Sequence, residues 1–199
     1  MATVTRVCVL KSGGDFTPRH VQWLARQVPG LVCLTDIAVP GVPVVQMQNA
    51  WPGWWSKMNL FSKAIPGDLL YLDLDTVVIG DLTPLEGVGE TTLLEDFYKP
   101  GLLASGLMYI REEDKAHVWD AWMADPDGHR ERCQTRERWG DQGFLQDVLQ
   151  AQTWQQALPG AVVSWKVHCQ KQIPHGARVV CFHGNPRPWA AKQSWVLPL

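Results

Sequence analysis

No apolar run in this sequence approaches the roughly 20 residues that a membrane-spanning helix needs, and the five cysteines form no Cys-x-x-Cys pair. Internal repeats and low-complexity segments are also lacking, as is a small-residue cleavage site after the short apolar run that precedes Lys11. The formal net charge is only −2, so no basic field favours general nucleic-acid binding. We therefore expect a cytoplasmic protein with reduced thiols rather than a disulfide framework.

The chain contains enough apolar sequence for one core. Its 199 residues are 46% hydrophobic and 19% charged, which predicts a single globular domain over residues 1–199. Val4–Leu10 has the pattern of a buried strand, residues 18–28 have apolar positions at helical spacing, and residues 31–34 form a second apolar run. This β-α-β opening predicts an α/β fold with a mostly parallel, mixed sheet flanked by helices. Further helices are expected at residues 54–64, 112–123 and 141–150, and further strands at residues 91–94, 107–110, 162–167 and 179–182.

Two carboxylates interrupt an otherwise apolar stretch. Residues 69–79 predict one buried strand, in which Asp73 and Asp75 would project to the same face. Burying two like charges costs several kcal/mol, and a divalent cation offsets that cost because hard cations take carboxylate oxygens. The pair therefore predicts a metal site able to bridge a nucleotide diphosphate. The alternative is a solvent-facing turn that ends the strand.

A second polar cluster follows the predicted strand at residues 179–182. His183 would supply a nitrogen ligand to the same ion, and mixed carboxylate and imidazole ligation suits Mn²⁺ better than Mg²⁺. Arg187 would hold a diphosphate through bidentate hydrogen bonds. The alternatives are a histidine bonded to a backbone carbonyl and a solvated surface arginine. Ligands of open α/β sheets bind beyond the carboxyl ends of the strands, where the Ser12-Gly13-Gly14 and Thr35-Asp36 segments also fall.

Four segments, in this order along the chain, resemble the GT-A glycosyltransferases of family 8, the type that includes glycogenin and the bacterial galactosyltransferases of lipooligosaccharide synthesis. They are residues 71–75, 105–109, 140–142 and 182–189. The resemblance implies a single GT-A (Rossmann-like) domain and a nucleotide-sugar donor, usually a UDP-sugar, used with Mn²⁺ (or Mg²⁺). It also implies transfer of a hexose with retention of anomeric configuration. The acceptor stays open among a glycan, a lipid-linked sugar, a protein side chain and a modified nucleic-acid base.

The resemblance assigns roles to individual residues. Asp73 and Asp75 match the metal ligands, and His183 is the expected third ligand. Asp141 and Gln142 match a catalytic pair that orients the donor sugar and stabilises developing positive charge. The residues expected to contact the donor are Ser12, Gly13, Asp36, Lys57, Asp73, Leu74, Ser105, Gly106, Gly184, Arg187 and Trp189.

Two positions depart from the family pattern. Cys181 stands where the metal histidine usually lies; His183, two residues later, is on the same side of an extended strand and would take over that role. Ala104 replaces an asparagine before the Ser105-Gly106 step, which removes one expected sugar contact. Donor-sugar identity is therefore open.

Three other interpretations compete. A haloacid dehalogenase-type phosphatase also has an Asp-x-Asp after an apolar strand, with the first aspartate as nucleophile, although that pair usually lies near the chain start. A non-catalytic carbohydrate-binding protein would use some of the eleven tryptophans. A zinc site would use His168, Cys169, Cys181 and His183, but their spacing matches no common zinc motif. The arginines at positions 130, 132, 136 and 138 indicate a solvated helix, or a surface for an anionic acceptor.

Overall fold

A computed structural model describes residues 4–199 of the chain; residues 1–3, part of the expected domain, lie outside the described part. The β-α-β opening is confirmed. It consists of strand β1 (Val4–Leu10), helix α1 (Pro18–Ala25) and strand β2 (Val32–Thr35), followed by the short strand β3 (Val44–Gln46). Strands β1, β2 and β3 pair in parallel.

These strands belong to a seven-stranded sheet with the order β3-β2-β1-β4-β7-β6-β8. Its other members are β4 (Asp68–Leu72), β6 (Thr92–Glu95), β7 (Leu103–Ile110) and β8 (Gln152–Thr153). The β1–β4 and β6–β8 pairings are parallel, whereas β7 runs antiparallel to both of its neighbours. The expected mostly parallel, mixed sheet is confirmed.

The prediction of one continuous strand over residues 69–79 is wrong. Strand β4 ends at Leu72, and a turn closed by the hydrogen bond from Thr76 N to Asp73 O (3.0 Å) follows it. Strand β5 (Thr76–Val78) then joins a separate three-stranded sheet of order β5-β10-β9, with β9 at Val162–Ser164 and β10 at Val179–Cys181. The chain therefore passes from one sheet to the other at the two aspartates, because the apolar residues on either side find different partner strands.

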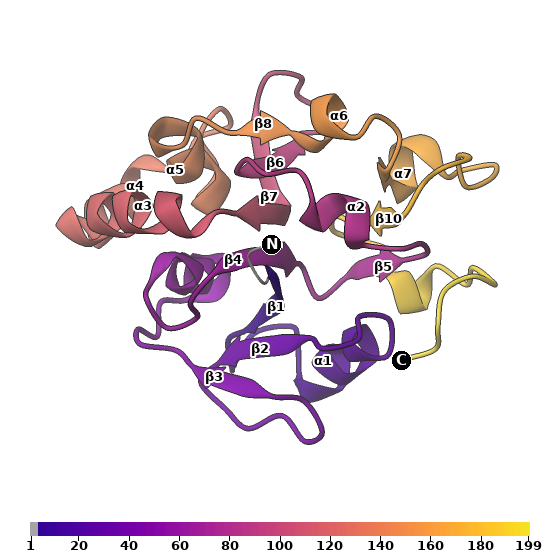
Figure 1. The fold of residues 1–199 in the computed structure, drawn as a ribbon, viewed down its shortest axis with the longest axis horizontal. Helices are drawn as coiled ribbons and strands as arrows, with labels where there is room; N and C mark the ends of the chain where they lie inside the picture. The colour runs from indigo at the N-terminus through magenta and orange to yellow at the C-terminus, as the bar shows by residue number, and fades with distance from the viewer. Residues whose placement is uncertain (1–3) are drawn as a thin grey trace.

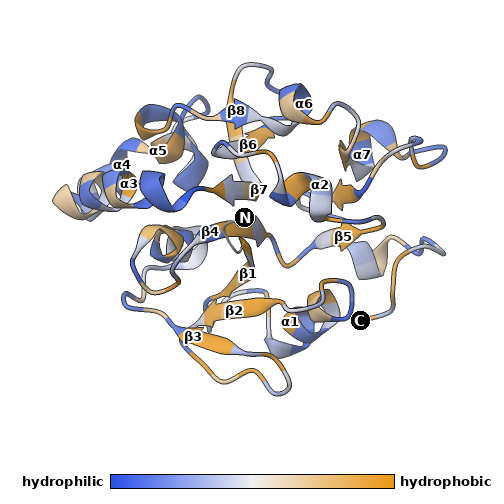
Figure 2. Ribbon diagram, in the orientation of Figure 1, coloured by the Kyte–Doolittle hydropathy of each residue, from blue (hydrophilic) through white to orange (hydrophobic). Residues whose placement is uncertain are grey.

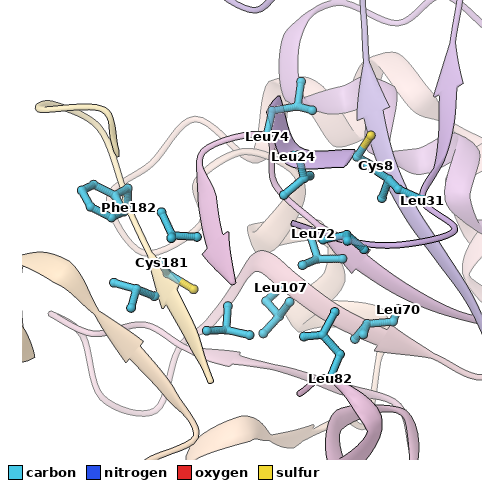
Figure 3. Close-up of a cluster of buried hydrophobic side chains, with 14 of the residues drawn as sticks. Cys8, Leu24, Leu31, Leu70, Leu72, Leu74, Leu82, Leu107, Cys181 and Phe182 are labelled. Atoms are coloured by element: carbon cyan, nitrogen blue, oxygen red, sulfur yellow. The ribbon is translucent and has the colours of Figure 1, made fainter. Parts of the chain in front are cut away.

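The large sheet is buried on both faces. Along β4, Leu70 and Leu72 face one core cluster, while Leu69 and Tyr71 face the other. Figure 3 shows the first cluster, where Leu72 of β4 and Leu107 of β7 approach Cys181 of β10. In Figure 2, strands β2, β3 and β5 are coloured as hydrophobic, whereas the edge strand β8 is coloured as hydrophilic. Burial on both faces explains the nearly continuous apolar pattern of β4.

The helices lie on both sides of the large sheet and pack against its two faces (Figure 1). The 3₁₀ helix η1 (Gly53–Phe61) replaces the helix expected at residues 54–64. Its residues from Trp55 to Phe61 are all buried, so this part of the helix has no side facing solvent. The strand expected at residues 162–167 ends at Ser164 and turns into α7. The other helices are α2 (Thr83–Glu86), α3 (Glu112–Ala124), α4 (Pro126–Arg132), α5 (Gly140–Val148), α6 (Trp154–Ala157), α7 (Trp165–His168) and η2 (Pro188–Ala190).

Within residues 4–199, no helix combines the length and the apolar character needed to cross a bilayer. All five cysteines are free and buried.

Candidate active site

One large cavity is lined by almost all of the residues that the sequence predicted to form the site. Its volume is about 980 Å³, at the upper end for ligand sites in proteins. The loops after β1, β4 and β10 line it together with the first turn of α5, so it opens where carboxyl ends of strands converge. The nominated residues in its wall are Ser12, Gly13, Lys57, Asp73, Leu74, Asp75, Ser105, Gly106, Asp141, Gln142, His183, Gly184 and Arg187. Asp36 and Trp189 do not line it.

The two aspartates of the turn are balanced by cations of the chain itself. Lys57 Nζ lies 2.9 Å from Asp73 Oδ1, and the Tyr71 hydroxyl donates to the same oxygen. Arg187 donates to Asp75, which is only 4% exposed. Burial and the neighbouring Asp73 charge raise the pKa of Asp75 to about 7, although Arg187 acts in the opposite direction. The cost of burying this pair is thus partly met within the protein.

Lys57 links the aspartate turn to α5. Its ammonium donates to the carbonyl and hydroxyl oxygens of Ser105 (3.4 and 3.3 Å) and lies 3.7 Å from Asp141 Oδ2. Burial by itself would lower the pKa of Lys57, but the Asp141 and Asp73 carboxylates outweigh burial and raise it. Lys57 therefore stays charged inside the cavity wall.

Asp141 lies in the cavity wall with its carboxylate almost closed to solvent. The residue is 4% exposed, and its buried Oδ2 accepts no hydrogen bond, although the Lys57 ammonium lies 3.7 Å away. Burial raises the pKa of this carboxyl, with Lys57 opposing. A buried carboxylate oxygen without a hydrogen bond is costly, and the Lys57 charge offsets part of this cost.

The Ser105-Gly106 step permits the close packing of the aspartate turn. Asp73 N donates to Gly106 O (3.0 Å), and a Cβ at position 106 would lie 3.3 Å from Asp73 Oδ2. Glycine thus leaves room for the Asp73 carboxylate beside β7.

His183 lines the cavity without completing a three-residue metal centre. Its Nε2 is hydrogen bonded to Ser164 Oγ (2.7 Å), and its ring stacks on Phe97 with centroids 5.8 Å apart. Among residues 4–199, no three His, Cys, Asp or Glu side chains are grouped to hold a metal ion. The expected set of Asp73, Asp75 and His183 is therefore not assembled, and neither is the zinc alternative.

Cys181 does not replace the histidine ligand. It is buried in β10 within the apolar cluster of Figure 3. Burial, together with the Asp73 and Asp75 charges, raises the pKa of the Cys181 thiol. A protonated thiol is a poor metal ligand.

The remaining donor set still fits a hard cation that is shared with a diphosphate. Mg²⁺-type sites commonly use one or two protein carboxylates, with substrate phosphates and water as the other ligands. Asp73 and Asp75 offer such a pair. The cavity wall contains five aspartates but only three basic side chains. Lys11, Lys57 and Arg187 are each already paired with an aspartate. A diphosphate entering this acidic wall needs further positive charge.

Asp36 and Trp189 support the wall from behind. Asp36 accepts hydrogen bonds from Ser12 N (2.8 Å), Ser12 Oγ (2.6 Å) and Lys11 Nζ (2.6 Å), which fixes the loop after β1. Trp189 packs against Trp23 of α1, with centroids 5.3 Å apart. Both residues therefore lie behind residues that line the cavity.

Several wall residues were not nominated from the sequence, and aromatic ones stand out among them. They include Phe16, Tyr71, Asp96, Tyr98, Trp54 and Trp139. The abundance of tryptophan indicated stacking somewhere, but no spacing rule separates these two tryptophans from those in the core.

The fold places this protein in a known structural class. A mixed seven-stranded sheet flanked by helices, with an aspartate turn leaving its central strand, is the GT-A architecture of glycosyltransferases. No family model and no curated protein matches the chain.

Solved structures give the particular likeness. The galactosyltransferase LgtC in complex with donor and acceptor sugar analogs matches with a TM-score of 0.63 and 12% identity, covering 96% of this chain and 90% of that chain. The apo glycosyltransferase GlyE of Streptococcus pneumoniae TIGR4 matches with a TM-score of 0.55 and 12% identity, covering 94% of this chain and 56% of that chain. The bifunctional WbbM apo structure matches with a TM-score of 0.57 and 12% identity, covering 94% and 47%. The likeness confirms the expected fold.

Proposed function

We propose that this protein is a glycosyltransferase that moves a hexose from a nucleotide sugar to an acceptor hydroxyl. A UDP-sugar is the donor that we propose to test before other nucleotide sugars. The observation that carries the proposal is the single cavity in which the aspartate turn, Lys57, Arg187 and the buried Asp141 carboxylate meet. The shared fold supports glycosyl transfer as the reaction, because the similar solved structures are glycosyltransferases. The five buried free thiols favour a reducing compartment, so we place the reaction in the cytoplasm.

Each group has a role in this proposal. Asp73 and Asp75 would hold Mn²⁺ or Mg²⁺ against the donor diphosphate; the bound ion supplies Lewis-acid stabilisation of the departing nucleotide. Arg187 exchanges Asp75 for a diphosphate oxygen and binds it in bidentate fashion. Ser12, Gly13 and Leu74 form the wall toward the nucleotide, and Gly184 leaves space beside Arg187.

The sugar end of the donor lies toward α5. The Asp141 carboxylate accepts a hydroxyl of the donor sugar, and Gln142 orients the sugar ring. The Asp141 carboxylate and the Gln142 amide stabilise the positive charge that builds on the anomeric carbon. With retention, the acceptor hydroxyl attacks from the side of the leaving group, and a diphosphate oxygen takes its proton.

The fold weakens the alternatives. In the phosphatase interpretation the first aspartate acts as nucleophile, but here Asp73 Oδ1 is engaged by Lys57 and Tyr71. A purely carbohydrate-binding protein has no use for two neighbouring carboxylates, one of them buried, that are paired with Lys57 and Arg187. The arginines at positions 130, 132 and 138 are paired with aspartates 127, 125 and 147, as a solvated surface requires.

The test is donor binding that depends on the aspartate turn. We expect UDP or a UDP-sugar with Mn²⁺ to raise the melting temperature of the wild type, with UDP-glucose, UDP-galactose and GDP-mannose compared. The Asp73→Asn and Asp75→Asn variants should lose most of this shift and at least 100-fold of nucleotide release. Losing a charged ligand to a shared cation removes several kcal/mol of binding.

Asp120→Asn, an exposed carboxylate on α3, is the matched control and should behave as wild type. A nucleotide shift of equal size in Asp73→Asn, Asp75→Asn and the control would refute the donor site. Release of phosphate from simple phosphoesters would indicate the phosphatase instead.

A further inference from the structure

The exposed tryptophans of this protein are confined to one place. Of eleven tryptophans, only Trp54 (47% exposed) and Trp139 (51% exposed) are open to solvent, and both line the cavity. Tyr98, 61% exposed, lines it as well. Exposing large aromatic faces to water is unfavourable, and such surface commonly marks a binding site.

The two tryptophans form a built surface, which we name the indole platform. Their ring centroids are 6.0 Å apart and their planes are tilted by 45°. Trp54 lies over Gly140, where a Cβ would come within 2.7 Å of its Nε1 and where φ is +63°. Trp139 is held by its bridge to Gln134 and by the hydrogen bond from Gly140 N to Cys133 O (2.9 Å). Both rings are thus fixed to the start of α5.

This location places the platform beside the reacting end of the cavity. Asp141 and Gln142 directly follow Gly140 and line the same cavity. A molecule lying on the indole faces therefore has polar side chains of the first turn of α5 close by. The combination of apolar faces with nearby polar side chains suits a ligand that has both C–H surfaces and hydroxyl donors.

Charge and ring geometry separate the occupants that could stack there. A single-stranded nucleic acid needs unpaired basic side chains along its phosphates as well as aromatic faces. The three basic residues of the wall are each paired with an aspartate, and the wall is acidic in balance. Rings tilted by 45° also form no parallel slot for a flat base. A pyranose ring is uncharged and presents C–H groups on one face with hydroxyls at its edge.

We infer that the acceptor is a neutral carbohydrate, and that one of its sugar rings lies on Trp54 and Trp139 with a hydroxyl directed toward the first turn of α5. This inference rests on the proposed function for the word acceptor, but the binding it describes does not require the donor. Among the acceptor classes left open by the sequence, it favours one that presents a sugar ring and disfavours a nucleic-acid base.

The test is saturation-transfer NMR with neutral disaccharides (lactose, maltose, cellobiose and chitobiose), without and with UDP and Mn²⁺. We expect at least one disaccharide to bind the wild type, and Trp54→Ala and Trp139→Ala to weaken that binding at least tenfold. Trp139→Phe should restore part of it. Trp119→Ala, a partly buried tryptophan outside the cavity, is the matched control and should bind as wild type.

UDP-induced thermal shifts in the same samples keep the two proposals apart. The alanine variants should retain the shift, which also shows that they are folded. Failure of every disaccharide to bind the wild type, binding unaffected in both alanine variants, or preferential binding of a 12-nucleotide single strand would each overturn the inference. Any of these results together with a normal UDP shift leaves the donor proposal intact, whereas a missing UDP shift in the wild type counts against the donor proposal alone.

Discussion

At the scale of single residues, the charge balance of the cavity depends on Lys57. It is the only side chain that contacts both Asp73 of the aspartate turn and Asp141 of α5 within the described chain. Its ammonium sits in a wall that is nearly closed to solvent, with 9% of the residue exposed. Removing it would leave two carboxylates facing each other without a counter-charge.

We predict that Lys57→Met destabilises the protein by about 3 kcal/mol, because breaking a buried ion pair leaves an uncompensated charge. Urea denaturation of the ligand-free protein measures this. The control is Lys63→Met, at an exposed position just after η1. It should change the free energy of unfolding by less than about 0.5 kcal/mol. Equal stability of the two variants would show that Lys57 is not needed to neutralise the aspartates.

At the scale of elements, the cavity is a meeting of loops whose shapes are set by side chains behind them. The loop after β1 is fixed by Asp36, which follows β2 and lies beside Ser12 only because β1 and β2 pair in parallel. The loop after β6 is shaped by Asp96, whose Oδ1 accepts from the amides of Tyr98 (2.8 Å) and Lys99 (3.0 Å). Such turns form because an aspartate side chain can accept from backbone amides just ahead of it.

Asp36 gives this arrangement a pH dependence. Burial opposes ionisation, but the hydrogen bonds from Lys11 and Ser12 outweigh it and lower the pKa of Asp36 from 3.8 to about 2. A depressed folded-state pKa means that the stabilisation is complete above about pH 4 and is lost as pH falls toward 2.

We therefore predict that Asp36→Asn lowers stability at pH 7 by about 2 kcal/mol, the usual size for lost hydrogen bonds to a charged group. The difference from wild type should shrink between pH 4 and pH 2. Melting temperatures measured across this range test it, with Asp120→Asn as the exposed control. A difference that stays constant down to pH 2 would contradict the prediction.

At the scale of the whole molecule, the last part of the chain returns to the first. Figure 1 shows the C-terminal segment running back beside α1, where Trp23 Nε1 donates to Leu197 O (2.8 Å). Trp189 packs on Phe16, His20 and Trp23, and the guanidinium of Arg187 lies 4.8 Å from the centre of the Phe16 ring. The cation that pairs with Asp75 is thus positioned by an aromatic cluster from the other end of the sequence.

We predict that Trp189→Ala destabilises the protein by about 2 kcal/mol, less than for a fully buried tryptophan, and weakens the UDP-induced thermal shift because Arg187 loses its support. Trp119→Ala provides a control of similar burial that does not touch this cluster. If Trp189→Ala lost stability but kept the full UDP shift, Arg187 would be positioned by other contacts.

The sequence by itself determined the local features of this protein. Apolar runs long enough for strands predicted β1, β2, β4, β6, β7 and β10, and turn-forming polar segments predicted where ligands would bind. Most of the nominated residues reached one cavity because strand ends in a parallel sheet converge whatever the details of packing.

Only the tertiary structure decided which residues share partners. It divides the apolar run at residues 69–79 between two sheets, and it places His183 in hydrogen-bond contact with Ser164. It also pairs Asp73 and Asp75 with cations that are distant in the sequence. It also left two tryptophans of eleven at the cavity mouth. Pairing and exposure depend on contacts between residues far apart in the chain, and the hydrophobic pattern of a single segment specifies burial without specifying the neighbour.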